Sequence, residues 1–153
     1  MTSTLLHKPS TELNLLLWSG QLKPVRFNEY AALRFLSSAL GALRDAKTQA
    51  LSPIGRYTVA HEGIYSLCLG SLYLHGLLPT GHEGSKALTL QVSTEMLGLT
   101  QRDQDKILYA NSLLEEIVTG GPVPIEVRAV LDLVYTGDRA VNRAREAYPD
   151  WFI

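Results

Sequence analysis

Two side chains in this sequence have types and spacing that suit acid–base chemistry on a phosphate. Arg56 and His61 form an Arg-x4-His pattern, and Glu62 follows directly. An arginine can hold a phosphate while a histidine moves a proton, provided that both side chains converge on one group. On a helix, residues five apart point about 140° away from each other around the axis. We therefore expect Arg56 to be a surface charge in a first helical turn and His61 to be partly buried and hydrogen-bonded. Catalysis by Arg56, His61 and Glu62 stays an alternative hypothesis.

The histidines and the single cysteine do not have the spacing of a metal site. His61 and His75 are fourteen residues apart, which on one helix is roughly 21 Å. His75 and His82 flank a loop near Glu83, without a tight pattern such as His-x3-His. Cys68 lies among leucines, where a buried thiol has a raised pKa and is inert. We predict no metal ion, no cofactor and no cysteine nucleophile.

A further group of candidates lies on the predicted last helix, where three arginines share a face with a tyrosine: Arg128, Tyr135, Arg139 and Arg143. Such a face can hold phosphates and stack a base. Acidic residues are interleaved with it at three- or four-residue spacing: Glu126, Asp132, Asp138 and Glu146. Because that arrangement is typical of a solvated, ion-paired surface, we favour this interpretation and keep ligand binding as the alternative.

The composition argues against several classes of protein. With a net charge of −1 at pH 7, the 153-residue chain has no overall attraction for nucleic acid or an anionic membrane. The uncharged stretch 63–81 is nearly long enough for a membrane span, but it contains serines, a histidine and glycines, and no Lys/Arg cluster flanks it. The first residues do not form the basic and apolar segments of a secretion signal. We predict a cytoplasmic, single-domain protein with no membrane partner.

Helix signals punctuate the whole chain, and no segment alternates as a strand does. Capping residues, prolines and glycines predict helices over 10–18, 28–49, from 53 to a loop at 76–85, over 86–97, over 100–118, and from 124 onward. The sequence therefore predicts an all-α, up-down bundle of about five helices over 28–148. A leader at 1–27 contains a short additional helix, and 149–153 forms an aromatic tail.

The helix that begins after Ser52 is predicted to be the centre of this bundle. Between residues 57 and 79 the chain carries one charged side chain, Glu62, and Gly63, Gly70 and Gly76 recur every six or seven residues. A helix that is apolar on all sides is buried. We expect neighbouring helices to pack close against its glycine positions.

Two segments of this region form a recognisable pattern: RYTVAHEG at 56–63 and LYLHGLLP at 72–79. The pattern continues in the segments 97–100 and 107–110. Together they resemble the HEPN superfamily of small helical bundles, over roughly residues 28–148. The resemblance implies an HEPN-like bundle, often a homodimer, in toxin–antitoxin and other defence systems.

Active members of that superfamily are metal-independent ribonucleases with an Arg-x(4–6)-His motif near the end of the fourth helix, whereas others are silent binding partners. In this chain Leu114 stands at the position expected for the arginine, Glu115 follows it, and no histidine occurs at 118–121. Glu115 and Glu116 place two carboxylates where an RNA backbone would bind, and like charges repel. The resemblance thus implies the fold without the ribonuclease motif.

Aromatic residues near the two ends are candidates for an interface: Trp18, Tyr148, Trp151 and Phe152. Exposed apolar patches mark contact surfaces, but aromatic side chains are equally common where a tail folds back over its own core. The sequence leaves both possibilities open.

Three functional hypotheses fit these observations. The first is a non-catalytic, homodimeric HEPN-like protein that binds a protein partner or a nucleotide or RNA. The second is a metal-independent ribonuclease whose site has moved to Arg56 and His61. The third is a generic helical interaction module.

Overall fold

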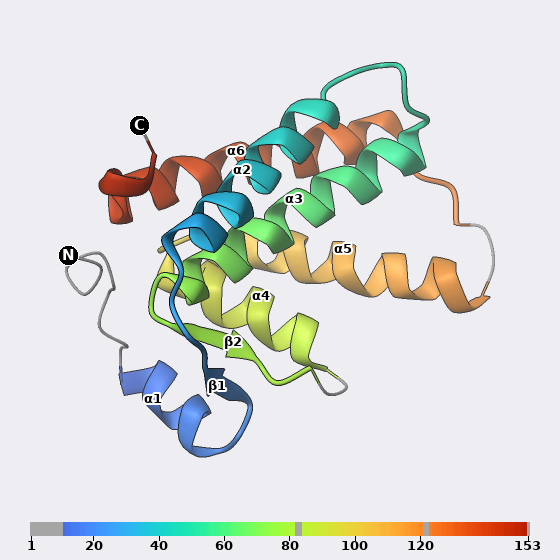
Figure 1. The fold of residues 1–153 in the computed structure, drawn as a ribbon. Helices are drawn as coiled ribbons and strands as arrows, with labels where there is room; N and C mark the ends of the chain where they lie inside the picture. Colours follow the sequence, from blue (N-terminus) through green and yellow to red (C-terminus); the bar gives the residue numbers. More distant parts are fainter. Residues whose placement is uncertain (1–10, 82–83, 121–122, 153) are drawn as a thin grey trace.

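Six helices and two short strands make up the part of the chain that the structure, a computed structural model, describes: residues 11–81, 84–120 and 123–152 (Figure 1). In chain order these are α1 (Thr11–Trp18), β1 (Leu22–Pro24), α2 (Glu29–Asp45), α3 (Pro53–Tyr73), β2 (Leu77–Pro79), α4 (Ser85–Met96), α5 (Gln101–Gly120), α6 (Val127–Ala147) and a 3₁₀ turn (Pro149–Trp151). The predicted helical bundle is confirmed. Within these ranges no helix is both long enough and apolar enough to cross a bilayer.

Local capping explains where the main helices begin. The Asn28 side chain accepts a hydrogen bond from the Ala31 amide at 3.1 Å, and the Ser52 hydroxyl accepts one from the Gly55 amide at 3.2 Å. The Thr100 hydroxyl does the same for the Asp103 amide at the start of α5. Each bond satisfies a backbone donor that has no partner within its helix. These three starts match the sequence prediction.

Helix α3 lies at the centre and contacts α2, α4, α5 and α6 (Figure 1). The predicted close packing is confirmed at Gly63 and Gly70, whereas Gly76 lies beyond the end of α3 in a turn with a φ of +74°. A methyl group added to Gly63 would lie 3.0 Å from Leu43 Cγ and 3.2 Å from the Ala39 carbonyl oxygen, both on α2. A methyl group on Gly70 would lie 3.0 Å from Leu36 Cδ2. The two glycines thus allow α2 to pack almost directly on the backbone of α3.

Gly137 serves the same purpose on α6. The helix is continuous from Val127 to Ala147, and a methyl group at Gly137 would lie 2.6 Å from Leu43 Cδ2. Leu43 therefore fills a space between Gly63 of α3 and Gly137 of α6. The missing side chain makes room for a leucine from α2.

The expectation of a fold without strands is wrong in one place. Strands β1 and β2 pair antiparallel, with Leu22 opposite Pro79 and Pro24 opposite Leu77. Each strand has only three residues and contains a proline, so neither shows the alternation by which strands are recognised. Leu22 and Leu77 are buried in a small second core, together with Leu13, Leu72 and Val92. The leader is thereby joined to the body of the protein.

The C-terminal residues also belong to the core. Tyr148 and Trp151 are 6% and 7% exposed, and the Trp151 ring meets the Phe27 ring edge-on at a centroid distance of 6.0 Å. The Tyr148 hydroxyl lies 3.0 Å from His75 Nε2. The segment up to Phe152 therefore covers the bundle, as one of the two sequence interpretations proposed. Ile153 lies outside the described residues.

The tight contact between α2 and α3 leads to a test of stability. We expect Gly63→Ala to lower the free energy of unfolding by about 1–3 kcal/mol, the usual cost of overpacking a filled core. The Ala39 carbonyl oxygen belongs to the backbone and cannot turn aside from the added methyl group. Urea unfolding monitored by circular dichroism measures the change.

Gly41→Ala is the matched control, because the nearest group to an added methyl there is the end of the Arg44 side chain at 3.7 Å. Alanine is roughly 1 kcal/mol more favourable than glycine in a helix, so this variant should be unchanged or more stable. Equal stability of the two variants would contradict the packing described for Gly63.

Candidate functional site

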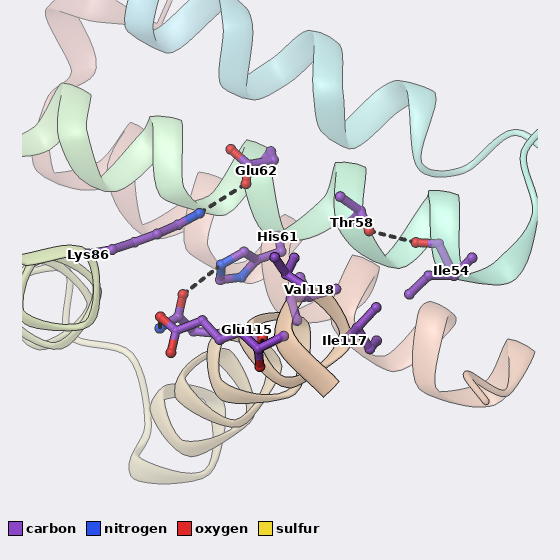
Figure 2. Close-up of a pocket in the computed structure, with 11 residues that line it drawn as sticks. Ile54, Thr58, His61, Glu62, Lys86, Glu115, Ile117 and Val118 are labelled. Carbon is purple, nitrogen blue, oxygen red and sulfur yellow. Dashed lines mark hydrogen bonds and ion pairs between the residues drawn. The ribbon is translucent and has the colours of Figure 1, made fainter. Parts of the chain in front are cut away.

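A cavity of about 340 Å³ lies between α3, the last turns of α5 and the first turn of α4 (Figure 2). We call it the α3–α5 pocket. Its walls are largely aliphatic, formed by Ile54, Leu114, Ile117 and Val118. Polar groups line the rest: Thr58, His61, Glu62, Lys86, Asn111, Glu115 and Thr119. The pocket thus combines an apolar wall with a small set of polar groups, as binding sites for small ligands or single side chains do.

His61 is the most deeply buried polar residue of this pocket, at 1% exposure. Its Nε2 lies 3.2 Å from Asn111 Oδ1, and Asn111 Nδ2 donates to Glu115 Oε1 at 3.3 Å. Because the amide oxygen of Asn111 can only accept, Nε2 carries the proton and donates it. Nδ1 of His61 is then an acceptor, and it is buried with no hydrogen-bond partner in the described structure.

The environment of His61 keeps the ring neutral. Burial lowers the pKa of the imidazole from 6.5 to about 4, and the nearby Lys86 ammonium adds to this effect. The carboxylate of Glu62 and the bond to Asn111 oppose it without reversing it. At neutral pH the side chain is therefore a donor at one nitrogen and an unused acceptor at the other.

Lys86 stands at the rim of the pocket and is already paired. Its Nζ lies 3.0 Å from Glu62 Oε1 and 4.7 Å from the centroid of the Tyr65 ring. Counted over the described lining residues, Glu62 and Glu115 outnumber the single ammonium of Lys86, so these residues together carry a net negative charge when His61 is neutral. A negative pocket with a paired lysine disfavours phosphate.

Arg56 lies elsewhere, and its expected position as a surface charge is wrong. The side chain is buried, with 7% of the residue exposed, and its Nε donates to the Ala46 carbonyl oxygen at 2.9 Å. Ala46 ends α2, so the guanidinium binds one of the carbonyl groups that the helix leaves without a partner. The structure brings His61 and Glu62 to one pocket and directs Arg56 to the end of a different helix. His61 is buried and hydrogen-bonded, as predicted.

Three of the candidate residues of α6 line two adjoining depressions of the surface, and two of its arginines are ion-paired. Arg139 binds the Asp103 carboxylate through two hydrogen bonds, of 2.9 and 2.7 Å, and lowers the pKa of that carboxyl group. Arg143 lies 3.6 Å from Glu146. Arg128 and Tyr135 line one surface depression together with Arg102 of α5, and Tyr135 and Arg102 also line the adjoining one, which contains Arg139. The ion-paired surface that the sequence favoured is present for Arg139 and Arg143.

The interface candidates divide in the same way. Trp18 is 92% exposed, whereas Tyr148 and Trp151 are buried within the chain. Phe152 is half-buried, with the Arg145 guanidinium 6.0 Å from its ring centroid. Trp18 is therefore the one of these four whose ring surface is free for contact with another molecule.

The remaining candidates are the cysteine and the possible metal ligands. Burial raises the pKa of the Cys68 thiol to about 12, as expected for an inert cysteine. Across the described ranges no three His, Cys, Asp or Glu side chains gather in a way that would hold a metal ion. His82 and Glu83, considered in the sequence as neighbours of His75, lie outside those ranges.

Asn111 and Lys86 were not predicted from the sequence as parts of a site. Asn111 carries a weak signal, since it lies on the same helical face as Ile107 and Leu114 and is an amide among apolar residues. A polar residue on a buried face needs a partner. Lys86 carries no such signal, because only the fold brings the start of α4 next to Glu62.

No protein-family model, curated protein or solved structure gives a significant match to this chain.

His61 should make the stability of the protein depend on pH. Its pKa is about 4 in the folded protein and 6.5 for an ordinary histidine, so between these values the unfolded chain binds a proton that the folded chain does not. The stabilisation is complete above pH 6.5 and is lost as the pH falls toward 4, by up to about 3 kcal/mol at roughly 1.4 kcal/mol per pKa unit. Urea unfolding across this range measures it.

His61→Gln keeps a polar side chain that does not titrate, and its stability should change less with pH over the same interval. NMR titration of the His61 ring gives the pKa directly. An imidazole that titrates near 6.5, or identical pH slopes for the two proteins, would contradict the buried neutral ring.

Proposed function

We propose that this protein is a non-catalytic HEPN-like binding protein whose α3–α5 pocket receives an apolar group with one hydrogen-bond donor, presented by a protein partner. The observation that carries the proposal is the buried Nδ1 of His61, an acceptor with no partner in the described structure, in a pocket with aliphatic walls. A buried polar atom without a hydrogen bond costs about 1–3 kcal/mol. A ligand that supplies a donor recovers part of that cost when it binds.

Several contacts favour a protein partner over a nucleotide or RNA. Among the described residues that line the pocket, the only cation is Lys86, which is paired with Glu62, and Glu115 adds a second carboxylate. On α6, Arg139 and Arg143 are each held by an acidic neighbour. Since phosphate recognition needs cations that are free to replace counterions, an uncharged apolar group suits this pocket better.

The HEPN-like part of the proposal is supported by the helical bundle and by the position of the pocket. In the family that the chain resembles, the ribonuclease motif of active members would fall at Leu114 and in the helical turn that follows it. Leu114 and Val118 line the pocket with aliphatic carbon. The segment that would cleave RNA in an active member is therefore suited to hold an apolar group. The resemblance suggests a toxin–antitoxin or other defence setting, and the single buried Cys68 fits a cytoplasmic location.

A pair of small probes tests this use of the pocket. We expect indole to bind, and 1-methylindole, which has the same ring but no N–H donor, to bind about fivefold more weakly. A net hydrogen bond contributes about 1 kcal/mol, which corresponds to this ratio. NMR chemical shifts of the Ile54, Leu114 and Val118 methyl groups and of the His61 ring report the binding. If neither probe shifts these signals, the pocket is not a binding site, and a module that binds through a flat surface becomes the better hypothesis.

We also expect the purified protein to leave single-stranded RNA intact when no metal is added. Arg56 is bound to the Ala46 carbonyl group and Lys86 to Glu62, so neither cation is available to hold a phosphate beside His61. The assay compares the wild type with Arg56→Ala and His61→Ala. RNA cleavage that both substitutions abolish would establish the relocated ribonuclease site and overturn the non-catalytic proposal.

A further inference from the structure

Two depressions adjoin on the surface between the first turns of α5 and the first part of α6. Their volumes are about 530 and 400 Å³, and Arg102, Asp132 and Tyr135 line both of them. We call the joined depressions the α5–α6 groove. It shares no lining residue with the α3–α5 pocket, which uses the second half of α5. The groove is therefore a separate feature of the surface.

Two of the cations in this groove are already held by carboxylates. Lys106 Nζ lies 2.7 Å from Asp132 Oδ1, and Arg139 binds the Asp103 carboxylate through two hydrogen bonds. Both pairs join α5 to α6. Because each of these four charges has an opposite charge beside it, the pairs leave little attraction for another molecule.

Two further arginines line the groove without such a partner. Arg102 of α5 and Arg128 of α6 line the same depression, and neither forms an ion pair within the part of the chain that the structure describes. Glu126 also lines this depression and is likewise outside the described ion pairs. Once the two pairs are set aside, two positive charges remain against one negative charge. An anionic group placed between the arginines would reduce the repulsion between them.

Carboxylates that are close to the groove in the sequence do not cancel this excess. Asp138 lies 3.0 Å from Lys47 Nζ, and Asp105 accepts a hydrogen bond from Gln101 Nε2 at 2.8 Å. Neither carboxylate lines the groove. The unpaired arginines thus determine which charge the groove attracts.

Apolar surface lies next to the two arginines. Leu131 and Tyr135 line the groove and are 39% and 56% exposed. They follow Arg128 by three and seven residues, so the three side chains share one face of α6. Arginine and tyrosine are enriched where proteins bind one another, and they account for a large share of the binding energy there. A ligand for this groove therefore needs an anionic group and an apolar group close together.

We infer that the α5–α6 groove binds an acidic segment of a protein partner, in which a carboxylate side chain lies next to an apolar one. The carboxylate binds between Arg102 and Arg128, and the apolar side chain packs on Leu131 and Tyr135. This inference concerns a second site and does not depend on the function proposed for the α3–α5 pocket.

The carboxylates of the groove favour a protein segment over a nucleic acid. A nucleic acid brings a phosphate with every nucleotide, and three acidic residues line the groove beside the arginines: Asp103, Glu126 and Asp132. A peptide can place one carboxylate at the arginines and uncharged groups beside the three acidic residues. Such a match of individual charges decides which partner binds.

Two matched peptides test the inference. The first is acetyl-Ala-Glu-Leu-Phe-Glu-Ala-amide, and the second has glutamine in place of both glutamates. We expect the acidic peptide to bind at least about fivefold more tightly, because it pairs with the exposed arginines. This advantage should shrink as salt is added, since exposed charges are screened. NMR shifts of the Leu131 methyl groups and the Tyr135 ring measure the binding.

Substitution of the arginines tests the contact from the side of the protein. Arg102→Gln and Arg128→Gln each remove one exposed charge and keep a polar side chain. Each should weaken binding of the acidic peptide by at least about threefold and leave the glutamine peptide unaffected. Arg34→Gln is the matched control, because Arg34 is an exposed arginine of α2 that does not line the groove. All three variants should unfold at the same urea concentration as the wild type.

Four results would overturn the inference: no binding of either peptide, equal binding of both, an equal loss in Arg34→Gln and Arg102→Gln, or tighter binding of a single-stranded RNA oligonucleotide that depends on both arginines. The last result would assign the groove to a nucleic acid. Failure here leaves the indole test of the α3–α5 pocket untouched, because the His61 and Leu131 signals report on different sites.

Discussion

The bundle depends on how near α2 lies to α3. Gly63 and Gly70 remove side chains from the face of α3 that meets α2, so that Leu36, Ala39 and Leu43 of α2 reach its backbone. Leu43 extends further, to Gly137 of α6, and thereby joins three helices at one point. Protein interiors are packed as densely as crystals, so helices held at this distance have little freedom to rotate. Helices α4 and α5 then cover the other side of α3 (Figure 1).

This arrangement decides which side chains of α3 can act together. With α2 on one side and α5 on the other, Arg56 turns toward the end of α2 and His61 turns toward Asn111. The two residues look like a catalytic pair in the sequence, but they serve different contacts. What remains at His61 is a neutral ring with an unused acceptor beside aliphatic walls. Among the described residues that line it, the one cation, Lys86, is already paired with Glu62 and is not free to stabilise a developing negative charge.

The parts of the structure that could be predicted are those that depend on residues close together in the sequence. Three helices are capped by hydrogen bonds between residues three apart, at Asn28, Ser52 and Thr100. The close packing at Gly63 and Gly70 could be predicted because both glycines lie on one apolar helix. The strands could not be predicted, because Leu22 and Pro79 are far apart in the sequence and lie opposite each other only once the chain has folded. The same holds for the pocket, where Lys86 and Asn111 join His61 from two other helices. Arg56 was misplaced because its partner is a backbone carbonyl group, and the sequence gives no sign of such a partner.

The pairing of β1 with β2 also sets an order of events during synthesis. The leader helix packs on Leu72, Leu77 and Val92, all of which leave the ribosome long after it does. Until that stretch has emerged, the leucines of α1 have only Leu22 of this core to cover them. Contacts so distant in sequence form late, because a long loop must close first. Helix α1 is thus made before the residues that cover it but is placed late, and during that interval its apolar face is open to chaperones or to other nascent chains.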